Sequence, residues 1–162
     1  MLSKADNQLL TQTDPETPMG KLFRRYWIPA LQSHELVSDG KPQRVKLLGE
    51  DLVAFRDTEG KVGLIDERCP HRGTSLYYGI NDGCGIRCMY HGWKFDTAGN
   101  CTEIPSEPTD GKFRQSIKLK SYPTKEVSGI VWTYMGPPDS QPDFPEFYWM
   151  GLPEDHKLVE RV

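Results

Sequence analysis

The stretch that decides the fold reads Cys69-Pro70-His71 and, sixteen residues further on, Cys88-Met89-Tyr90-His91. Each half offers one sulfur and one imidazole nitrogen, which are ligands that zinc and iron accept in proteins. In an extended segment the side chains of residues i and i+2 point to the same side, so Cys69 and His71 can reach one centre. Cys88 and His91 converge where a tight turn bends the second half. The pattern therefore predicts a metal site made by these four residues.

Two kinds of metal site fit two Cys and two His. Structural zinc sites usually build each half from like ligands, C-x2-4-C and then H-x3-5-H, whereas each half of this site is mixed. A [2Fe-2S] cluster with two Cys on one iron and two His on the other is the Rieske centre. Cys69, His71, Cys88 and His91 resemble its pattern of C-x-H, a spacer, and C-x-x-H. The resemblance implies that the cysteines hold the inner iron and the histidines the outer, more exposed iron. A zinc-stabilised interaction module is the alternative from another class.

Four neighbours of the ligands distinguish this chain from the high-potential Rieske proteins of respiratory and photosynthetic cytochrome complexes. Those proteins carry an extra Cys in each ligand loop, joined as a disulfide, and Ser and Tyr hydroxyls that donate to the cluster sulfurs. Here Thr74 and Tyr90 occupy the positions of those cysteines, and Trp93 and Phe95 those of the hydroxyl donors. Because such donors stabilise the reduced cluster, their absence predicts a potential in the lower part of the range of roughly −150 to +300 mV.

Longer stretches resemble the amino-terminal Rieske [2Fe-2S] domain of Rieske non-haem iron aromatic-ring oxygenase alpha subunits. These stretches are residues 69–73, 91–96, 98–100 and 104–108, and the leader 17–29 is similar to the start of the phthalate 4,5-dioxygenase-like branch. The resemblance implies a [2Fe-2S] cluster that takes electrons from a reductase or ferredoxin electron donor. It implies delivery to a mononuclear Fe(II) in a catalytic oxygenase domain, and a homotrimer if the chain is part of the full subunit. The expected setting is the catabolism of aromatic compounds.

The oxidation step itself is not expected in this chain. Mononuclear iron in such oxygenases is held by a facial triad of two His and one carboxylate, with the histidines close together in sequence. The chain has four histidines; two are assigned to the cluster, and His34 and His156 are 122 positions apart. We therefore predict no catalytic residue and no oxygen-activating iron here, with His34 and His156 on the surface. A free-standing Rieske-type ferredoxin is the alternative carrier, although such ferredoxins are usually shorter and lack these extensions.

Composition indicates one small cytoplasmic domain with its own core. The chain has 162 residues and a net charge of −3, so neither nucleic acid nor an anionic membrane is an expected partner. No apolar run approaches the length of a membrane span, and the first residues lack the pattern of a signal peptide. The two remaining cysteines, Cys84 and Cys101, are expected to be reduced.

Charged residues surround the ligands on both sides. Arg68, Arg72, Arg87 and Lys94 could dock an acidic ferredoxin or reductase by electrostatic steering. Acidic residues interleave with them, so a mixed, solvated face is the competing interpretation.

The remaining pattern predicts a mainly β fold, a Rieske-type antiparallel β sandwich or barrel with two cluster-binding hairpin loops and short amino-terminal helices. Ser3 with Asp6, and Thr17 with Pro18, predict two helix starts. Strands are expected at 44–48, 52–56, 62–65, 93–95, 116–119 and 130–134, separated by Gly and Asp/Asn turns. The domains predicted are a helical leader with a first strand (1–40), the Rieske domain (41–135), and a Pro/aromatic tail (136–162) leading toward a catalytic domain. The alternative for the tail is that its aromatic residues only cover the β core.

Overall fold

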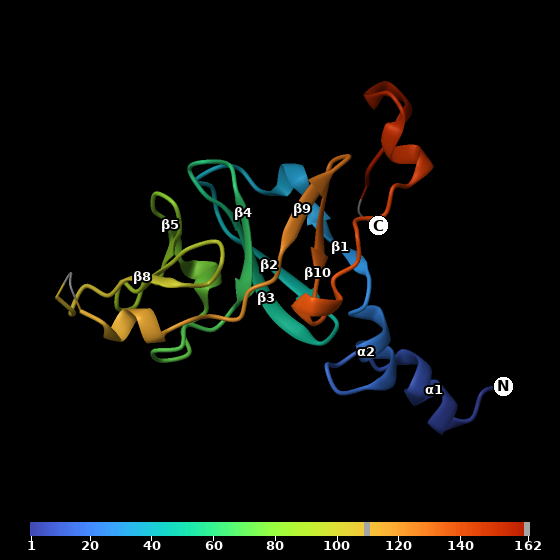
Figure 1. Ribbon diagram of the computed structural model, residues 1–162, viewed down its shortest axis with the longest axis horizontal. Coiled ribbons are helices and arrows are strands. Elements are labelled where there is room, and N and C mark those ends of the chain that lie inside the picture. The colour runs from blue at the N-terminus through green and yellow to red at the C-terminus, as the bar shows by residue number, and fades with distance from the viewer. Residues whose placement is uncertain (109–110, 161–162) are drawn as a thin grey trace. The chain divides into compact units, whose positions relative to one another are not determined.

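The computed structural model describes residues 1–108 and 111–160, in which short antiparallel strands predominate (Figure 1). The strands are β1 (Trp27–Gln32), β2 (Gln43–Leu47), β3 (Glu50–Arg56), β4 (Val62–Asp66), β5 (Ile80–Asn81), β6 (Ile86–Arg87), β7 (Lys94–Phe95), β8 (Cys101–Glu103), β9 (Thr124–Val127) and β10 (Ile130–Tyr134). Two α-helices, α1 (Lys4–Thr11) and α2 (Pro18–Phe23), precede them. The 3-10 helices are η1 (Ser33–Glu35), η2 (Leu76–Tyr78), η3 (Phe113–Ser116), η4 (Pro138–Ser140), η5 (Tyr148–Gly151) and η6 (Glu154–His156). The predicted antiparallel β fold with short amino-terminal helices is confirmed.

The described strands form three sheets, with the orders β1-β10-β9, β2-β3-β4 and β5-β6-β7-β8. The chain divides into two compact units. Unit 1 comprises residues 1–33, 46–50 and 125–162, and unit 2 comprises residues 34–45 and 51–124. Both predicted ligand segments therefore belong to unit 2.

The two helices begin where the capping residues predict. In α1 the Ser3 hydroxyl accepts a hydrogen bond from the Asp6 amide, which caps the helix, and donates one to the Asp6 carboxylate. In α2 the Thr17 hydroxyl accepts from the Gly20 amide, and Pro18 occupies the first turn, where no backbone donor is needed.

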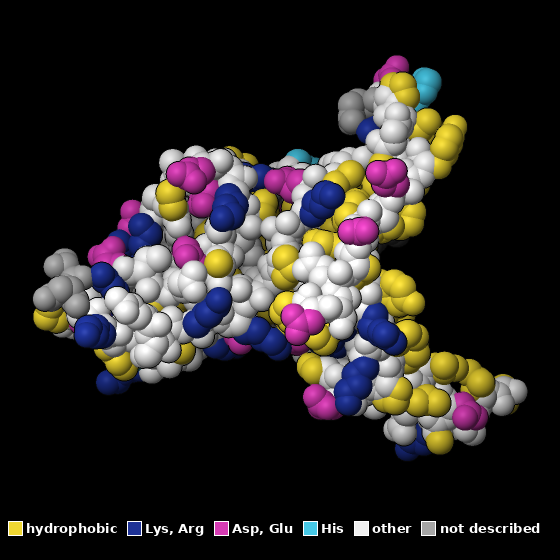
Figure 2. Space-filling model, in the orientation of Figure 1, with side chains coloured by type: hydrophobic (Ala, Val, Ile, Leu, Met, Phe, Trp, Pro, Cys, Tyr) yellow, Lys and Arg dark blue, Asp and Glu magenta, His cyan; other side chains and the backbone are white. Residues whose placement is uncertain are grey.

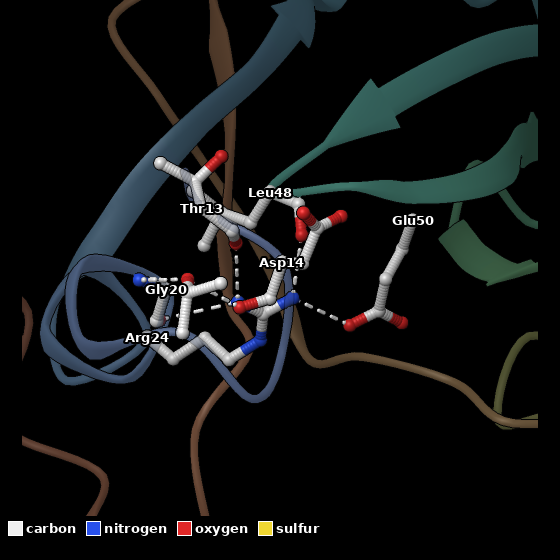
Figure 3. A network of polar contacts seen from close by, with 7 residues as sticks. Thr13, Asp14, Gly20, Arg24, Leu48 and Glu50 are labelled. Atoms are coloured by element: carbon white, nitrogen blue, oxygen red, sulfur yellow. Dashed lines mark hydrogen bonds and ion pairs between the residues drawn. The ribbon is translucent and has the colours of Figure 1, made fainter. Parts of the chain in front are cut away.

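A nearly buried ion pair holds the segments of unit 1 around α2 together (Figure 3). The Arg24 guanidinium donates to the carbonyl oxygens of Thr13, Gly20 and Leu48 and contacts the Glu50 carboxylate at 2.8 Å. The two side chains are only 9% and 11% exposed. Since most of its donors have partners, the charge of Arg24 is compensated although it lies away from water.

The sheet of unit 1 is covered by the Pro/aromatic tail. β1 pairs with β10 in antiparallel register from Trp27 opposite Tyr134 to Gln32 opposite Ile130, with an irregularity after Pro29. The Trp27 indole donates to the Pro142 carbonyl oxygen at 3.0 Å, and the Phe144 ring packs edge-on against Trp27 at 5.5 Å. These contacts agree with the alternative for the tail, in which its aromatic residues cover β strands.

The core of unit 2 contains both cysteines of the predicted metal site. β3 pairs with β4 from Leu52 opposite Asp66 to Arg56 opposite Val62. One continuous cluster of buried residues comprises Val53, Phe55, Ile65, Cys69, Leu76, Ile86, Cys88, Trp93, Phe95, Cys101, Ile104 and Leu119. Fully burying a side chain such as Phe55 or Ile65 contributes about 1.5–3 kcal/mol. The apolar packing that stabilises the unit thus also anchors Cys69 and Cys88.

One strand prediction was wrong. Residues 116–119 form no strand: η3 ends at Ser116, and Lys118 makes only an isolated bridge with Asn100. Glu107 accepts hydrogen bonds from the amides of Phe113 and Arg114 at the start of η3, and this 3-10 helix includes Ser116, where the strand was expected to begin. The other five predicted strands exist within a few residues of their expected bounds.

The surface is mixed in charge. On the visible face, Lys and Arg side chains are interspersed with Asp and Glu (Figure 2). Among the described residues, no helix combines the length and apolar character that crossing a membrane requires.

Candidate metal centre

The first ligand segment is a closed loop that follows β4. The Cys69 amide donates to the Thr74 carbonyl oxygen at 2.9 Å, and the Gly73 amide donates back to the Cys69 carbonyl oxygen at 2.8 Å. Gly73 has φ of +69°, a conformation that glycine adopts without steric cost. The loop buries Cys69 and exposes His71.

The second ligand segment repeats this construction between β6 and β7. The Cys88 amide donates to the Trp93 carbonyl oxygen at 2.8 Å, and the Gly92 amide donates to the Cys88 carbonyl oxygen at 3.0 Å. Gly92 has φ of +74°. Cys88 is buried and His91 is exposed, so each of the two loops has a buried thiol and an exposed imidazole.

The two loops bring their ligands together as two like pairs. The Cys69 and Cys88 thiols are neighbours; burial first, and then the adjacent Cys88 thiol, raise the pKa of Cys69 to about 11. The rings of His71 and His91 lie 4.5 Å apart between centroids, edge to face. Desolvation, then the charges of His71 and Arg72, lower the pKa of His91, which favours the neutral imidazole that can bind a metal.

This donor set fits a cluster with two protein ligands on each iron. Cys69 neighbours Cys88, and His71 neighbours His91, so the predicted ligands meet as two pairs; no group of three or more Cys, His, Asp or Glu side chains suited to a single ion is found among the described residues. Two sulfurs lie on the buried side and two nitrogens on the exposed side. A metal that binds a thiol displaces the thiol proton. Bound iron would therefore supply the positive charge that balances the two buried thiolates.

The first loop is supported by a buried carboxylate. Glu67 accepts hydrogen bonds from the Ser75 hydroxyl and from Arg44 Nε, the latter at 3.1 Å. The Arg44 guanidinium also lies over the Tyr77 ring, 4.2 Å from its centroid. The sequence does not predict these contacts, since Arg44 is 23 positions from Glu67.

Arg87 supports the second loop. Its guanidinium contacts Asp82 at 2.6 Å and Glu103 at 2.7 Å, and it donates to the Gly92 carbonyl oxygen at 2.9 Å. Hydrogen bonding to both carboxylates raises the pKa of Arg87, and the same contacts lower the pKa values of Asp82 and Glu103. Among the four cations considered for docking, Arg87 is therefore engaged within the loop structure.

The histidines and cysteines outside the two loops lie elsewhere. His34 and His156 are exposed, in η1 and η6. Cys84 is free and exposed in a turn, and Cys101 is free and buried in β8. The structure thus places Cys69 next to Cys88 and His71 next to His91, and it places these four other residues outside the loops.

Residues 26–123 match the family of the Rieske [2Fe-2S] domain, and the chain belongs to this family. The cofactor of the family is the [2Fe-2S] cluster that its description names.

Similar proteins of known function are oxygenase subunits. The chain is 47% identical over 160 residues to the phthalate 4,5-dioxygenase oxygenase subunit of Pseudomonas putida, covering 98% of this chain and 36% of that protein. It is 49% identical over 150 residues to the 3-chlorobenzoate-3,4-dioxygenase oxygenase subunit of Comamonas testosteroni, covering 93% of this chain and 35% of that protein. The chain thus spans about a third of the length of these relatives. The resemblance to oxygenases of the phthalate 4,5-dioxygenase-like branch is confirmed.

Solved structures of oxygenases are also similar to this chain. Dicamba monooxygenase bound to dicamba matches with a TM-score of 0.70 and 29% identity, covering 80% of this chain and 41% of that one. An oxygenase and ferredoxin complex of carbazole 1,9a-dioxygenase matches with a TM-score of 0.62 and 34% identity, covering 74% of this chain and 31% of the matched one. The Rieske-type fold predicted from the sequence is therefore confirmed.

Proposed function

We propose that Cys69 and Cys88 bind the inner iron of the [2Fe-2S] cluster, and that His71 and His91 bind the outer iron. The observation that supports this assignment is the repeated loop construction, in which each loop has a buried thiol and an exposed imidazole, and the two thiols and the two imidazoles are neighbours of their own kind. When bound, the cluster accepts one electron and passes it on. The protein supplies two rigid loops, a dry side at the sulfurs, and an exposed side at the histidines.

The exposed histidine side is the point where electrons enter and leave. His71 and His91 are exposed, and the apolar side chains of Met89, Tyr90 and Phe113 from the same or neighbouring segments are also exposed, by 64%, 58% and 58%. A partner that packs on these residues approaches the histidine edges without a layer of protein in between. The buried cysteines, in contrast, give no such access.

The chain acts as the electron-transfer domain of an aromatic-ring-hydroxylating oxygenase. Support comes from the two relatives described above, both named as oxygenase subunits, of which it spans about a third. The mononuclear iron then belongs to a catalytic domain or partner, which agrees with the lack of a second local histidine pair in the sequence. Within the chain we assign residues 1–40 to the leader, 41–135 to the Rieske domain, and 136–162 to the tail that leads toward the catalytic domain.

The partners follow from this role. An electron donor of the reductase or ferredoxin class is required, and a structural neighbour has been solved as an oxygenase and ferredoxin complex. The full subunit forms a homotrimer in the cytoplasm, and its substrate is an aromatic compound bound outside this chain.

Ligand variants test the assignment. Cys69→Ser, His71→Ala, Cys88→Ser and His91→Ala are each expected to abolish the reduced Rieske EPR signal. Cys84→Ser, His34→Ala and His156→Ala are matched controls, because these exposed residues lie outside both loops. Each control is expected to retain iron, sulfide and signal at the level of the unmodified chain. A ligand variant with an unchanged signal would remove that residue from the set.

Electron transfer is tested on the cluster-loaded chain. Stopped-flow mixing with a pre-reduced [2Fe-2S] ferredoxin should bleach the visible bands of the oxidised cluster, more slowly at high salt if charges steer docking. Absence of reduction by every donor of this class, in a protein that dithionite reduces, would contradict the electron-transfer role.

A further inference from the structure

Trp93 connects the two ligand loops in two different ways. Its backbone carbonyl oxygen accepts the hydrogen bond from the Cys88 amide that closes the second loop. Its indole instead covers His71, a ligand from the first loop, with ring centroids 4.6 Å apart and planes only 3° from parallel. One residue therefore closes one loop and stacks on the ligand of the other.

The indole is itself held in place. Trp93 is 8% exposed within the core cluster of unit 2, and the Phe113 ring lies edge-on to it at 6.2 Å and 82°. A ring held in the core limits the rotation of the exposed imidazole that stacks on it. The orientation of His71 is thus determined by core packing, although His71 itself is exposed.

The two histidines have different surroundings. His91 has no stacking contact of the kind that His71 makes among the ring contacts of the described residues. It lies edge-on to His71 and contacts Tyr90, tilted by 47° at 3.9 Å, and Tyr90 is 58% exposed. A buried indole therefore faces one ligand, and a solvated phenol lies beside the other.

We infer that Trp93 is a positioning residue that fixes the His71 imidazole, makes the two histidine ligands inequivalent, and lowers the reduction potential of the site. This inference rests on the proposed function. An indole face attracts positive charge. The net charge of the oxidised centre is one unit more positive than that of the reduced centre. The stacked ring also keeps water away from His71, and water favours the more highly charged reduced state. Both effects favour the oxidised state.

Three variants separate this role from simple core filling. Trp93→Leu removes the ring, Trp93→Phe keeps an aromatic face, and Phe95→Leu removes a ring from the same buried cluster. Phe95 makes no ring contact with either histidine among the contacts of the described residues. Each cluster-loaded protein is analysed for iron and sulfide, for midpoint potential, and by pulsed EPR for the nitrogen couplings of the two histidine ligands.

The expected result is a change confined to one histidine. Trp93→Leu should raise the potential and shift one nitrogen coupling, Trp93→Phe should lie between it and the unmodified chain, and Phe95→Leu should leave both couplings unchanged. Where Trp93→Leu does not retain a cluster, the comparison of Trp93→Phe with Phe95→Leu decides in the same way. Unchanged couplings and potential in the Trp93 variants, or equal changes with Phe95→Leu, would overturn the role of Trp93 alone. An unmodified chain without iron and sulfide would instead overturn the proposed function and this inference with it.

Discussion

Arg87 Nη1 donates a hydrogen bond of 2.9 Å to the carbonyl oxygen of Gly92, so a side chain that precedes Cys88 supports the backbone that follows His91. The same guanidinium contacts Asp82 and Glu103, which lie in the β5–β6 turn and in β8. The second ligand loop is therefore fixed from both sides by one cation.

Replacing Arg87 with Gln is expected to loosen this loop. Hydrogen bonds to charged groups contribute about 1.5–3 kcal/mol, but the Asp82 and Glu103 side chains are 46% and 47% exposed, which weakens their share. We expect the free energy of unfolding to fall by about 1–2 kcal/mol and a chelator to remove iron faster. Lys118→Gln changes an exposed cation outside the loops and is the control. Equal rates of iron loss in Arg87→Gln and the unmodified chain would contradict this role.

The same contacts predict a pH dependence. The hydrogen bond from Arg87 is the main cause that lowers the pKa of both Asp82 and Glu103. Because the folded pKa values lie below the unfolded ones, the unfolded chain binds protons first as the pH falls. The stabilisation is therefore present at neutral pH and is lost below about pH 4. In 13C NMR titrations the two carboxyl groups should titrate at higher pH in Arg87→Gln than in the unmodified chain; coincident titrations would show that Arg87 is not the cause.

The two loop glycines provide a matched pair of substitutions. Gly73 and Gly92 both have positive φ, so alanine is strained at either position, at a cost of about 1–2 kcal/mol. A Cβ on Gly73 meets nothing within 4 Å, whereas a Cβ on Gly92 lies 2.8 Å from Pro105 Cγ. Gly92→Ala should therefore destabilise the protein and lower cluster content more than Gly73→Ala. Denaturant unfolding and iron analysis measure the difference, and equal losses would mean that the Pro105 ring moves aside freely.

Unit 1 offers a test of ion-pair burial. Arg24→Ala removes the guanidinium that faces the nearly buried Glu50 carboxylate, and breaking a buried pair in this way costs about 3–5 kcal/mol. The pair of Lys21 with Glu16 has side chains 61% and 91% exposed, so Lys21→Ala should cost less than about 1 kcal/mol. Thermal unfolding, monitored by circular dichroism, compares the stability losses of Arg24→Ala and Lys21→Ala. A small loss for Arg24→Ala would show that the network in Figure 3 contributes little to stability.

Local sequence signals were sufficient for much of the fold. Ser3 and Thr17 predicted both helix starts because a cap is made by residues within one turn. The predicted strand at Ile130–Tyr134 coincides with β10 because its β-branched and aromatic residues face a buried environment. A first strand was predicted within residues 1–40 but without bounds, since Pro29 interrupts the pattern of β1 and its partner β10 is about a hundred residues away.

The candidate site shows the same division between features that local sequence signals predict and features that depend on distant segments. The spacing of the four predicted ligands predicts the chemistry, and the structure adds the repeated backbone hydrogen bonds that close each of the two loops. The supporting contacts of Arg44 with Glu67, and of Trp93 with His71, join residues from separate segments. Side-chain contacts of this kind depend on tertiary packing. They produce no periodic pattern and no local motif in a single sequence.

The most direct test of the central claim is a Mössbauer spectrum of the 57Fe-labelled chain, oxidised and then reduced with dithionite. The account predicts two iron sites in equal amounts with different isomer shifts, and an added electron located on the site with the two neutral histidines, because the thiolate-bound site carries more negative charge. Two equivalent irons, or a chain that contains zinc and no iron after strictly anaerobic preparation, would contradict the assignment of Cys69, His71, Cys88 and His91 as paired ligands of one [2Fe-2S] cluster.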